Sequence, residues 1–505
     1  MISAYMFYAV LAQPLFAKTY GSAEDEHAWS IIQTTDGGYA IAGATRSFGA
    51  GLDDFLILKL DRYGDIEWTR SIGGPQRDLA YSLFQTSDGG YIVVGITYSF
   101  GTGDEDIMVI KLGSVGNLEW AKTYGGPDLD ECYAGSLART ADDGCVFVGG
   151  TKSFGAGDVD IMVVKLGATG NIEWARTFGY QYRDFGYSVI QTGNGGYVVV
   201  GQTMGTAVGP GKVLVLRLSP SGDLEWSNML SGPYTNEAFE VIQTSDGGYA
   251  IVGNTDIPGA DLECMVIKLG STGNLEWAKA IGGPDWDESY SIAQTPDGGY
   301  VVAGITLSYG PDDLFLFKLS ATGELVWGRT FGGPSRDALA FLKRTGDGGF
   351  AITGYTESFG VGGRDIMVIT VEPDGSYPDC VSDCAPYVEI HTLSVSSPSL
   401  GDLCSPITSD PNPSINTPNL TVSDVCVPLY ASDLTPGREP RGIVCSHVAG
   451  GILFRSHAEL AAEIYSPDGR LVYSGHLQKG ENRIPLGQGV YLWQAGPYRG
   501  KAVVR

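Results

Sequence analysis

The chain has 505 residues, with 58 acidic against 32 basic side chains and a formal net charge of −26. This excess of acid argues against nucleic acid as a partner, because phosphate backbones are bound by clustered Lys and Arg. Hydrophobic residues make up 43% of the chain, which is enough for a large core. The 73 glycines follow no collagen period and therefore indicate many tight turns between short strands.

The N-terminal segment predicts export. Residues 2–12 are apolar and are followed by Gln13 and Pro14, as in the core of a secretory signal peptide, although the basic residues that usually come first are missing. A buried N-terminal strand is the alternative. The run is too short to cross a bilayer as a helix, which needs about 20 residues. We expect residues 1–13 to be a signal-peptide-like segment and the chain to carry no transmembrane anchor.

Residues 14–377 consist of seven sequence repeats. The motif Gln-Thr-x-Asp-Gly-Gly-Tyr, found at 85–91 in the second repeat, and a later tryptophan, Trp120 in the same repeat, both recur every 50 to 54 residues. Each repeat carries four strand patterns separated by glycine-containing turns. Four antiparallel strands in each of seven repeats predict an all-β, seven-bladed β-propeller. In the second repeat the expected strands are 82–86, 90–97, 106–112 and 118–124.

The ends of the repeat region predict how the ring closes. The last repeat has its third strand at 365–371, but no tryptophan-bearing fourth strand follows it. Residues 15–21, LFAKTYG, match the LEWAKTYG sequence of the second repeat, and Phe16 lies 52 residues before Trp68. We therefore expect the N-terminal strand to complete blade seven.

Acidic residues gather in two sets of loops. The loops between strands two and three and the loops between blades meet on one face of a propeller, and both sets are rich in Asp and Glu. These side chains either cap loop N–H groups or bind a cation or cationic ligand, and calcium suits such oxygen-rich loops. The candidate ligand- or cation-binding residues are Asp78, Asp104, Asp106, Asp130, Asp158, Asp160, Asp184, Asp287 and Asp337.

Residues 378–445 are rich in Ser, Pro, Thr and Cys and are typical of a linker. Clustered cysteines in an exported segment indicate one or two disulfides, with zinc binding or free thiols as the alternatives. Because their number is odd, at least one has no partner within the segment. The disulfide candidates are Cys380, Cys384, Cys404, Cys426 and Cys445.

Residues 446–505 show short alternating strands around turns and predict a small β-sandwich. The order Asp-Gly-Arg-Leu-Val at 468–472, Gly-Val-Tyr-Leu at 489–492 and a terminal Lys-Ala-Val-Val resembles the C-terminal sorting domain of proteins exported by the type IX secretion system. The resemblance implies that the type IX machinery is a partner. It also implies a secreted or cell-surface location in a bacterium with an outer membrane. The sorting-signal residues it implies are Gly469, Arg470, Gly489, Tyr491 and Lys501.

The propeller repeats also resemble those of bacterial and archaeal surface propellers, which implies a cell-surface setting and carries over no catalytic residue. Only one histidine, His27, lies in the repeat region, so histidine-based triads and metal sites lack ligands there. We therefore predict a non-enzymatic binding scaffold for a glycan, protein or cation, with no firmly implied cofactor.

The alternative is an extracellular polysaccharide hydrolase or lyase with its site on the acidic face. Non-repeating carboxylate, Tyr and Arg residues at the channel mouth would favour the enzyme. Equivalent residues around the ring would favour the scaffold.

Overall fold

The computed structural model describes residues 14–377, except 156–157, 205–209, 233–234 and 257–261, and short strands between residues 382 and 504. Every regular element in this part of the chain is a β-strand. It contains no helix of the length and apolarity needed to cross a membrane. The chain divides into two compact units, residues 1–427 and 428–505.

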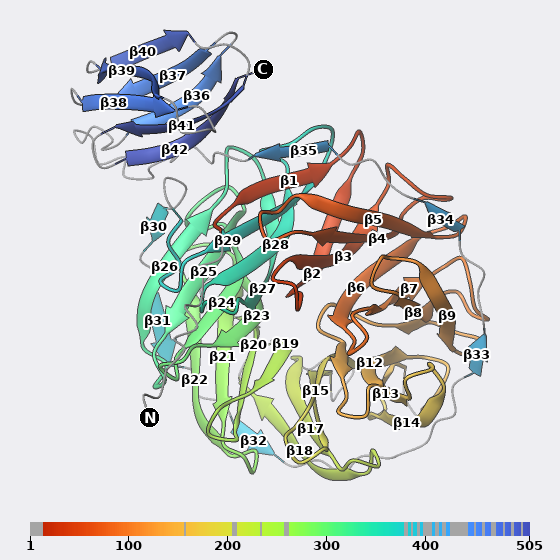
Figure 1. The fold of residues 1–505 in the computed structure, drawn as a ribbon. Coiled ribbons are helices and arrows are strands. Elements are labelled where there is room, and N and C mark those ends of the chain that lie inside the picture. The colour runs from red at the N-terminus through yellow and green to blue at the C-terminus, as the bar shows by residue number, and fades with distance from the viewer. Residues whose placement is uncertain are drawn as a thin grey trace, which may run out of the picture. The chain divides into compact units, whose positions relative to one another are not determined.

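The first unit contains seven four-stranded antiparallel blades arranged as a ring (Figure 1), so the predicted seven-bladed propeller is confirmed. In blade 3, the two short strands β10 and β11 together take the place of one inner strand. From the innermost strand outward, the blades are β2–β5 (Glu26–Gln33, Tyr39–Thr45, Asp54–Leu60, Ile66–Gly73), β6–β9 (Asp78–Gln85, Tyr91–Thr97, Asp106–Leu112, Leu118–Gly125), β10–β14 (Asp130–Glu131, Leu137–Arg139, Cys145–Thr151, Asp160–Leu166, Ile172–Phe178), β15–β18 (Asp184–Gln191, Tyr197–Thr203, Lys212–Leu218, Leu224–Ser231), β19–β22 (Asn236–Gln243, Tyr249–Asp256, Leu262–Leu269, Leu275–Gly282), β23–β26 (Asp287–Gln294, Tyr300–Thr306, Asp313–Leu319, Leu325–Phe331), and β27–β29 (Asp337–Arg344, Phe350–Thr356, Asp365–Val371) followed by β1 (Ala17–Gly21).

The N-terminal strand closes the ring as the sequence predicts. Strand β1 pairs antiparallel with β29, and Tyr20 lies opposite Ile366. The Tyr20 ring is fully buried, and its hydroxyl donates a hydrogen bond of 2.6 Å to the carbonyl of Gly64 in blade 1. Closure therefore joins the first and last blades through both backbone pairing and a buried side chain.

The recurring tryptophan and the tyrosine of the Gly-Gly-Tyr motif pack against each other between neighbouring blades. The ring of Trp68 lies edge-on to that of Tyr91 in the next blade, with centroids 5.6 Å apart. Phe16 of the closing strand makes the same contact with Tyr39, also at 5.6 Å. Gly116 has a positive φ of 77°, and a Cβ there would lie 2.8 Å from the Trp68 ring. The tryptophan, the tyrosine and the turn glycine thus recur together because one packing contact needs all three.

Short strands after the propeller pair with the outer edges of six blades, which the sequence does not predict. An outermost strand has free N–H and C=O groups that an extended chain satisfies by pairing. These strands meet the blades in an order opposite to the chain direction, so β30 to β35 lie in turn along the periphery of the ring (Figure 1). The pairs are β30 (Ser382–Cys384) with β26, β31 (Tyr387–Ile390) with β22, β32 (Ser394–Ser396) with β18, β33 (Ile407–Ser409) with β9, β34 (Ser414–Asn416) with β5, and β35 (Thr421–Asp424) with β1.

The predicted disulfides fall mostly outside the described residues. Cys380, Cys404 and Cys426 are not described, while Cys384 lies in β30 and Cys445 in β36. No disulfide is found among the described residues, and the pairing within the segment stays a prediction. The free cysteines in the described propeller are buried: Cys132, Cys145 and Cys264.

The second unit contains two antiparallel sheets. One has the order β36-β37-β40, and the other has the order β39-β38-β41-β42. Gly489 and Tyr491 lie in β41 and Lys501 in β42, whereas Gly469 and Arg470 lie outside the described residues. The sandwich and its sorting role stay predictions. The bounds are β36 (Ile443–Val448), β37 (Gly451–Ser456), β38 (Leu460–Tyr465), β39 (Leu471–Leu477), β40 (Gly480–Pro485), β41 (Gly489–Ala495) and β42 (Tyr498–Val504).

Candidate functional site

The acidic residue that opens each inner strand is a buried loop anchor. Asp78 accepts hydrogen bonds from the backbone N–H of Gly74 at 2.8 Å and from the hydroxyl of Ser99 at 2.7 Å. These contacts tie the loop between two blades to the loop between strands two and three. Equivalent carboxylates share the position, and none has more than 1% of its surface exposed: Glu26, Asp130, Asp184, Asp287 and Asp337.

The candidate ligand- or cation-binding residues meet only in pairs among the described residues, as Asp106 and Asp130 do on either side of Gly125. Asp106 is buried and accepts the N–H groups of Thr102 and Gly103 at 2.8 and 3.1 Å, whereas Asp104 is exposed. In the third blade Asp160 is buried in the same way and Asp158 is exposed. Within the described residues, no group of three or more His, Cys, Asp or Glu side chains is placed to hold a metal ion.

Buried carboxylates also face one another across the blade interfaces. A Cβ at Gly73 would lie 1.8 Å from Asp54 Oδ1 and 2.8 Å from Asp78 Oδ2, so both acids pack on the same glycine. Burial, opposed in part by hydrogen bonds from backbone N–H groups, raises the pKa of Asp54 to about 6. Burial likewise raises the pKa of Asp365 to about 7, and the nearby Glu26 adds to this. These acids therefore supply less negative charge to the face than the sequence suggests.

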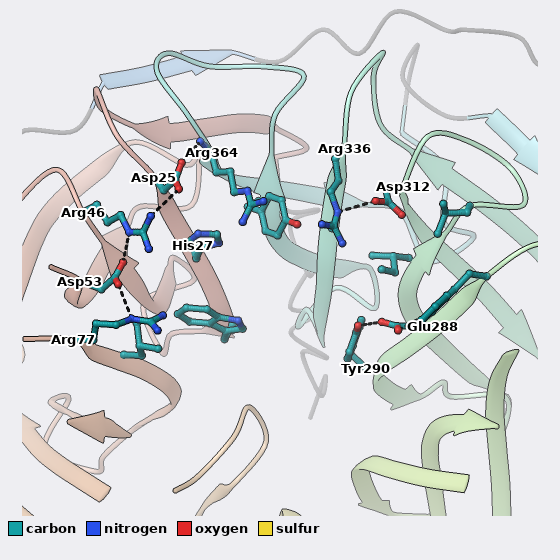
Figure 2. Close-up of a pocket in the computed structure, with 17 residues that line it drawn as sticks. Asp25, His27, Arg46, Asp53, Arg77, Glu288, Tyr290, Asp312, Arg336 and Arg364 are labelled. Atoms are coloured by element: carbon teal, nitrogen blue, oxygen red, sulfur yellow. Dashed lines mark hydrogen bonds and ion pairs between the residues drawn. The ribbon is translucent and has the colours of Figure 1, made fainter. Parts of the chain in front are cut away.

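A pocket of about 570 Å³ opens at the channel mouth, on the face formed by these loops. Its lining comes from blades 6, 7, 1 and 2, and therefore from one side of the ring. In Figure 2, side chains of Asp25, Arg46, Asp53 and Arg77 stand on one side of the pocket. A second group of labelled side chains stands opposite them: Glu288, Tyr290, Asp312 and Arg336.

Paired charges hold the first group in place. The Asp53 carboxylate, only 5% exposed, accepts the Nε–H of Arg46 at 2.8 Å and that of Arg77 at 2.9 Å. The Nη1 atom of Arg46 also lies 3.5 Å from Asp25. One buried carboxylate thus fixes two guanidinium groups, which favours a defined geometry over a mobile surface.

The opposite group is held by similar contacts. Asp312 Oδ2 lies 2.7 Å from Nε of Arg336. Glu288 accepts hydrogen bonds from the Tyr290 hydroxyl and, at 2.7 Å, from Nε1 of Trp286. Burial raises the pKa of Glu288 above its ordinary value, with the Trp286 bond acting in the opposite direction.

Aromatic rings form one wall of the pocket. His27 is stacked on Trp29 with ring centroids 5.6 Å apart and meets Tyr355 edge-on at 5.1 Å. Arg364 lies over the Tyr355 ring at 4.7 Å. Burial lowers the pKa of His27 to about 4, and the charge of Arg364 contributes, so the imidazole is neutral at ordinary pH.

Aromatic residues on the innermost strands contact those of adjacent blades, and of these only Trp29 and Tyr290 line the mouth pocket. In five blades the strand register shifts at this position, so the aromatic residue is the extra residue of a β-bulge, as Trp29 is between Ala28 and Ser30. Trp29 and Tyr290 line both the mouth pocket and a smaller cavity of about 170 Å³ beyond it. The aromatic collar comprises Trp29, Tyr81, Tyr133, Tyr187, Phe239, Tyr290 and Phe341.

The pocket is lined by residues at repeat positions where the residue type differs from blade to blade. The position after the loop-anchoring acid holds His27 in blade 1 and Glu288 in blade 6, and the position before it holds Arg77 in blade 2 and Arg336 in blade 7. The residues predicted from the sequence are acids that repeat, and these variable residues are not among them. Aligning the seven repeats and selecting variable polar positions beside the constant acid could have found them. The position after the acid is occupied in turn by His27, Leu79, Glu131, Phe185, Glu237, Glu288 and Ala338.

No protein-family model and no curated protein matches the sequence. Among solved structures, the chain is similar to a protein of unknown function from Dyadobacter fermentans, with 12% identity and a TM-score of 0.42 over 70% of this chain and 97% of that one. It is also similar to PorZ, a surface component of the type IX secretion system of Porphyromonas gingivalis, with 12% identity and a TM-score of 0.41 over 96% of this chain and 60% of PorZ. The polysaccharide lyase Uly1 shows 10% identity and a TM-score of 0.43, over 70% and 92% of the two chains. Likenesses this distant carry no argument about function.

Proposed function

We propose that the protein is an exported binding scaffold that holds a saccharide in the pocket at the channel mouth. The observation that carries the proposal is the combination of aromatic rings, such as Trp29, with fixed arginine–carboxylate pairs, such as Arg77 and Asp53. Sugar rings offer an apolar face to an aromatic ring and hydroxyl groups to charged partners. The pocket volume lies in the range of small-ligand sites and favours such a ligand over a flat protein surface.

A cation is the weaker choice of ligand for this face. The acids that the sequence singled out are mostly buried and already accept loop hydrogen bonds, as Asp78 and Asp106 do. The mouth pocket itself contains four arginines, which repel a cation. The geometry therefore supports an uncharged or negatively charged ligand.

An enzyme acting on the same saccharide is the second candidate. The lining is asymmetric and contains carboxylate, tyrosine and arginine residues, which is the arrangement expected of a hydrolase or lyase. We place the enzyme second because Asp25, Asp53 and Asp312 are already paired with arginines, so Glu288 has no free carboxylate partner in the pocket. Glu288, with its raised pKa and its contact with Tyr290, has the environment of a general acid. Formation of reducing ends or of unsaturated uronate during incubation with polysaccharides would establish the enzyme. Binding without either product supports the scaffold.

Export belongs to the same proposal. The signal-peptide-like residues 1–13 and the sorting-domain resemblance of residues 446–505 support passage across the outer membrane by the type IX machinery, with disulfides forming in residues 378–445. In a bacterium with that system, a chain shortened at residue 445 should remain in the periplasm, while the full chain reaches the surface or medium. Equal export of both chains would contradict the sorting role.

A pair of matched variants tests the binding site. Trp29 and Phe239 occupy the same collar position, but only Trp29 lines the mouth pocket. A glycan array identifies a bound oligosaccharide, and calorimetry then compares W29A with F239A. Stacking on an aromatic side chain is worth about 1–3 kcal/mol for a nucleic-acid base, and we expect a comparable gain for the apolar face of a sugar. W29A should therefore weaken binding at least tenfold, and F239A should stay within twofold of wild type. Equal effects of the two variants would place the ligand elsewhere.

A further inference from the structure

Resting on the proposed function, we infer that the pocket selects acidic saccharides, and that Arg77 and Arg336 hold the ligand's carboxylate or sulfate group. The two arginines come from opposite sides of the pocket, at the same repeat position in blades 2 and 7. This position is held by a basic residue in only three repeats, so it is not part of the shared propeller framework.

Each of the two guanidinium groups is anchored at one end only. Arg77 contacts Asp53 through Nε at 2.9 Å, and Arg336 contacts Asp312 through Nε at 2.7 Å. Within the described part of the chain, their hydrogen bonds and ion pairs involve Nε alone. Their side chains are 49% and 46% exposed, and in Figure 2 both guanidinium ends point toward the space between the two groups of side chains. The terminal Nη groups are therefore available to a ligand.

An anionic group fits these Nη donors better than a hydroxyl does. Guanidinium binds carboxylate and sulfate oxygens through two parallel N–H donors, which adds both strength and orientation. The pocket lining holds four arginines, Arg46, Arg77, Arg336 and Arg364, against four carboxylates. In a chain of net charge −26, this balanced lining is a place where an anion meets far less repulsion than the overall charge implies.

The aromatic wall explains why the anion should belong to a sugar. His27 stacked on Trp29 offers an uncharged surface beside the guanidinium groups, because the imidazole stays neutral. A uronic acid or sulfated sugar carries both features in one ring, namely an apolar face and an anionic substituent. Free phosphate or a simple carboxylate would use the arginines and leave the aromatic wall uncovered.

Blade 4 supplies a matched control. Arg183 occupies the same repeat position as Arg77 and Arg336, and its Nε lies 3.3 Å from Asp158. It does not contribute to the pocket lining. Its replacement removes the same charge from the same face and leaves the proposed site intact.

The test is calorimetric titration of the full chain with three tetrasaccharides of matched length: oligogalacturonate, its methyl ester, and a sulfated galactan fragment. Wild type should bind at least one acidic probe tenfold more tightly than the ester, and the two acidic arms show whether carboxylate or sulfate is preferred. R77Q and R336Q should each weaken the acidic complex at least tenfold and the ester complex less than threefold. R183Q should leave both unchanged.

Circular dichroism and the melting temperature show whether the variants are folded. R77K and R336K keep the positive charge at each position but lose the two parallel N–H donors of the guanidinium group. Equal binding of ester and acid by wild type would overturn the inference and leave the proposed function standing. An R183Q effect as large as that of R77Q would also overturn it, because it would indicate a general charge effect. Failure of every saccharide to bind, acidic or neutral, would instead contradict the proposed function.

Discussion

Replacing Asp365 with asparagine should stabilise the propeller above neutral pH. Asp365 opens β29, is fully buried, and accepts the backbone N–H of Val361. A Cβ at Gly21 of the closing strand would lie 1.3 Å from its Oδ1 atom, so the carboxylate packs directly on the glycine backbone of that strand. Burial, with a smaller contribution from Glu26, raises its pKa to about 7.

The magnitude follows from proton linkage. An aspartate in the unfolded chain has a pKa near 3.9, so the folded protein retains a proton at Asp365 that the unfolded chain has lost. The stabilising contribution is therefore complete below about pH 4 and is lost as pH rises through 7. A shift of about three pKa units corresponds to about 4 kcal/mol, and relaxation of the site reduces this, so we expect D365N to gain on the order of 2–3 kcal/mol over wild type at pH 8.

The assay is urea unfolding of wild type and D365N at pH 5, 6, 7 and 8. The wild-type free energy of unfolding should fall across this range more steeply than that of the variant. D374N is the control, because hydrogen bonds from Ser376 hold the pKa of Asp374 below its ordinary value, and its replacement should give no gain at pH 8. If D365N instead destabilises the protein equally at pH 5 and pH 8, the buried acid is serving as an ionised hydrogen-bond acceptor and the reasoning fails.

Three further predictions concern the ring. Y20A should lower the free energy of unfolding by about 3–5 kcal/mol, because it removes a fully buried ring, whereas Y63A, at a 55% exposed position, should change it by less than about 0.5 kcal/mol in the same urea assay. G116A should cost at least about 1 kcal/mol, because the residue has a positive φ and a Cβ would meet Trp68; an unchanged melting temperature would contradict that packing. A chain ending at residue 377 exposes the blade edges that β30–β35 cover and should self-associate more than the full chain in sedimentation velocity, and a monomer at all concentrations would argue against that pairing.

The propeller was predictable because its determinants repeat. Tyr91 and Trp68 recur in register with Gly116, and the recurrence marks an aromatic contact that five of the seven blade interfaces make. The closing strand followed from the same logic, since Phe16 takes the place of a tryptophan. A contact that is made many times leaves a periodic trace in the sequence, and a fold built of such contacts can be inferred from that trace.

The residues that line the mouth pocket do not recur with the repeat period. Asp78 stands out in the sequence because every blade needs a loop anchor, and the structure places it in the interior, where it anchors loops. The residue type at the position of Arg77, beside it, changes from blade to blade, and nothing local in the sequence shows that Arg77 lines the same pocket as Arg336. The β30–β35 pairings escaped prediction for another reason. Their Ser- and Thr-rich strands follow the free edges of the blades and are only three or four residues long, too short for a recognisable strand pattern.

The decisive measurement is a crystal structure of the protein with a bound acidic oligosaccharide. We expect the sugar to occupy the channel mouth, with its ring on the His27–Trp29 wall and its anionic group between Arg77 and Arg336. A saccharide bound on the outer strands or on the opposite face of the propeller, with the mouth pocket empty, would contradict it.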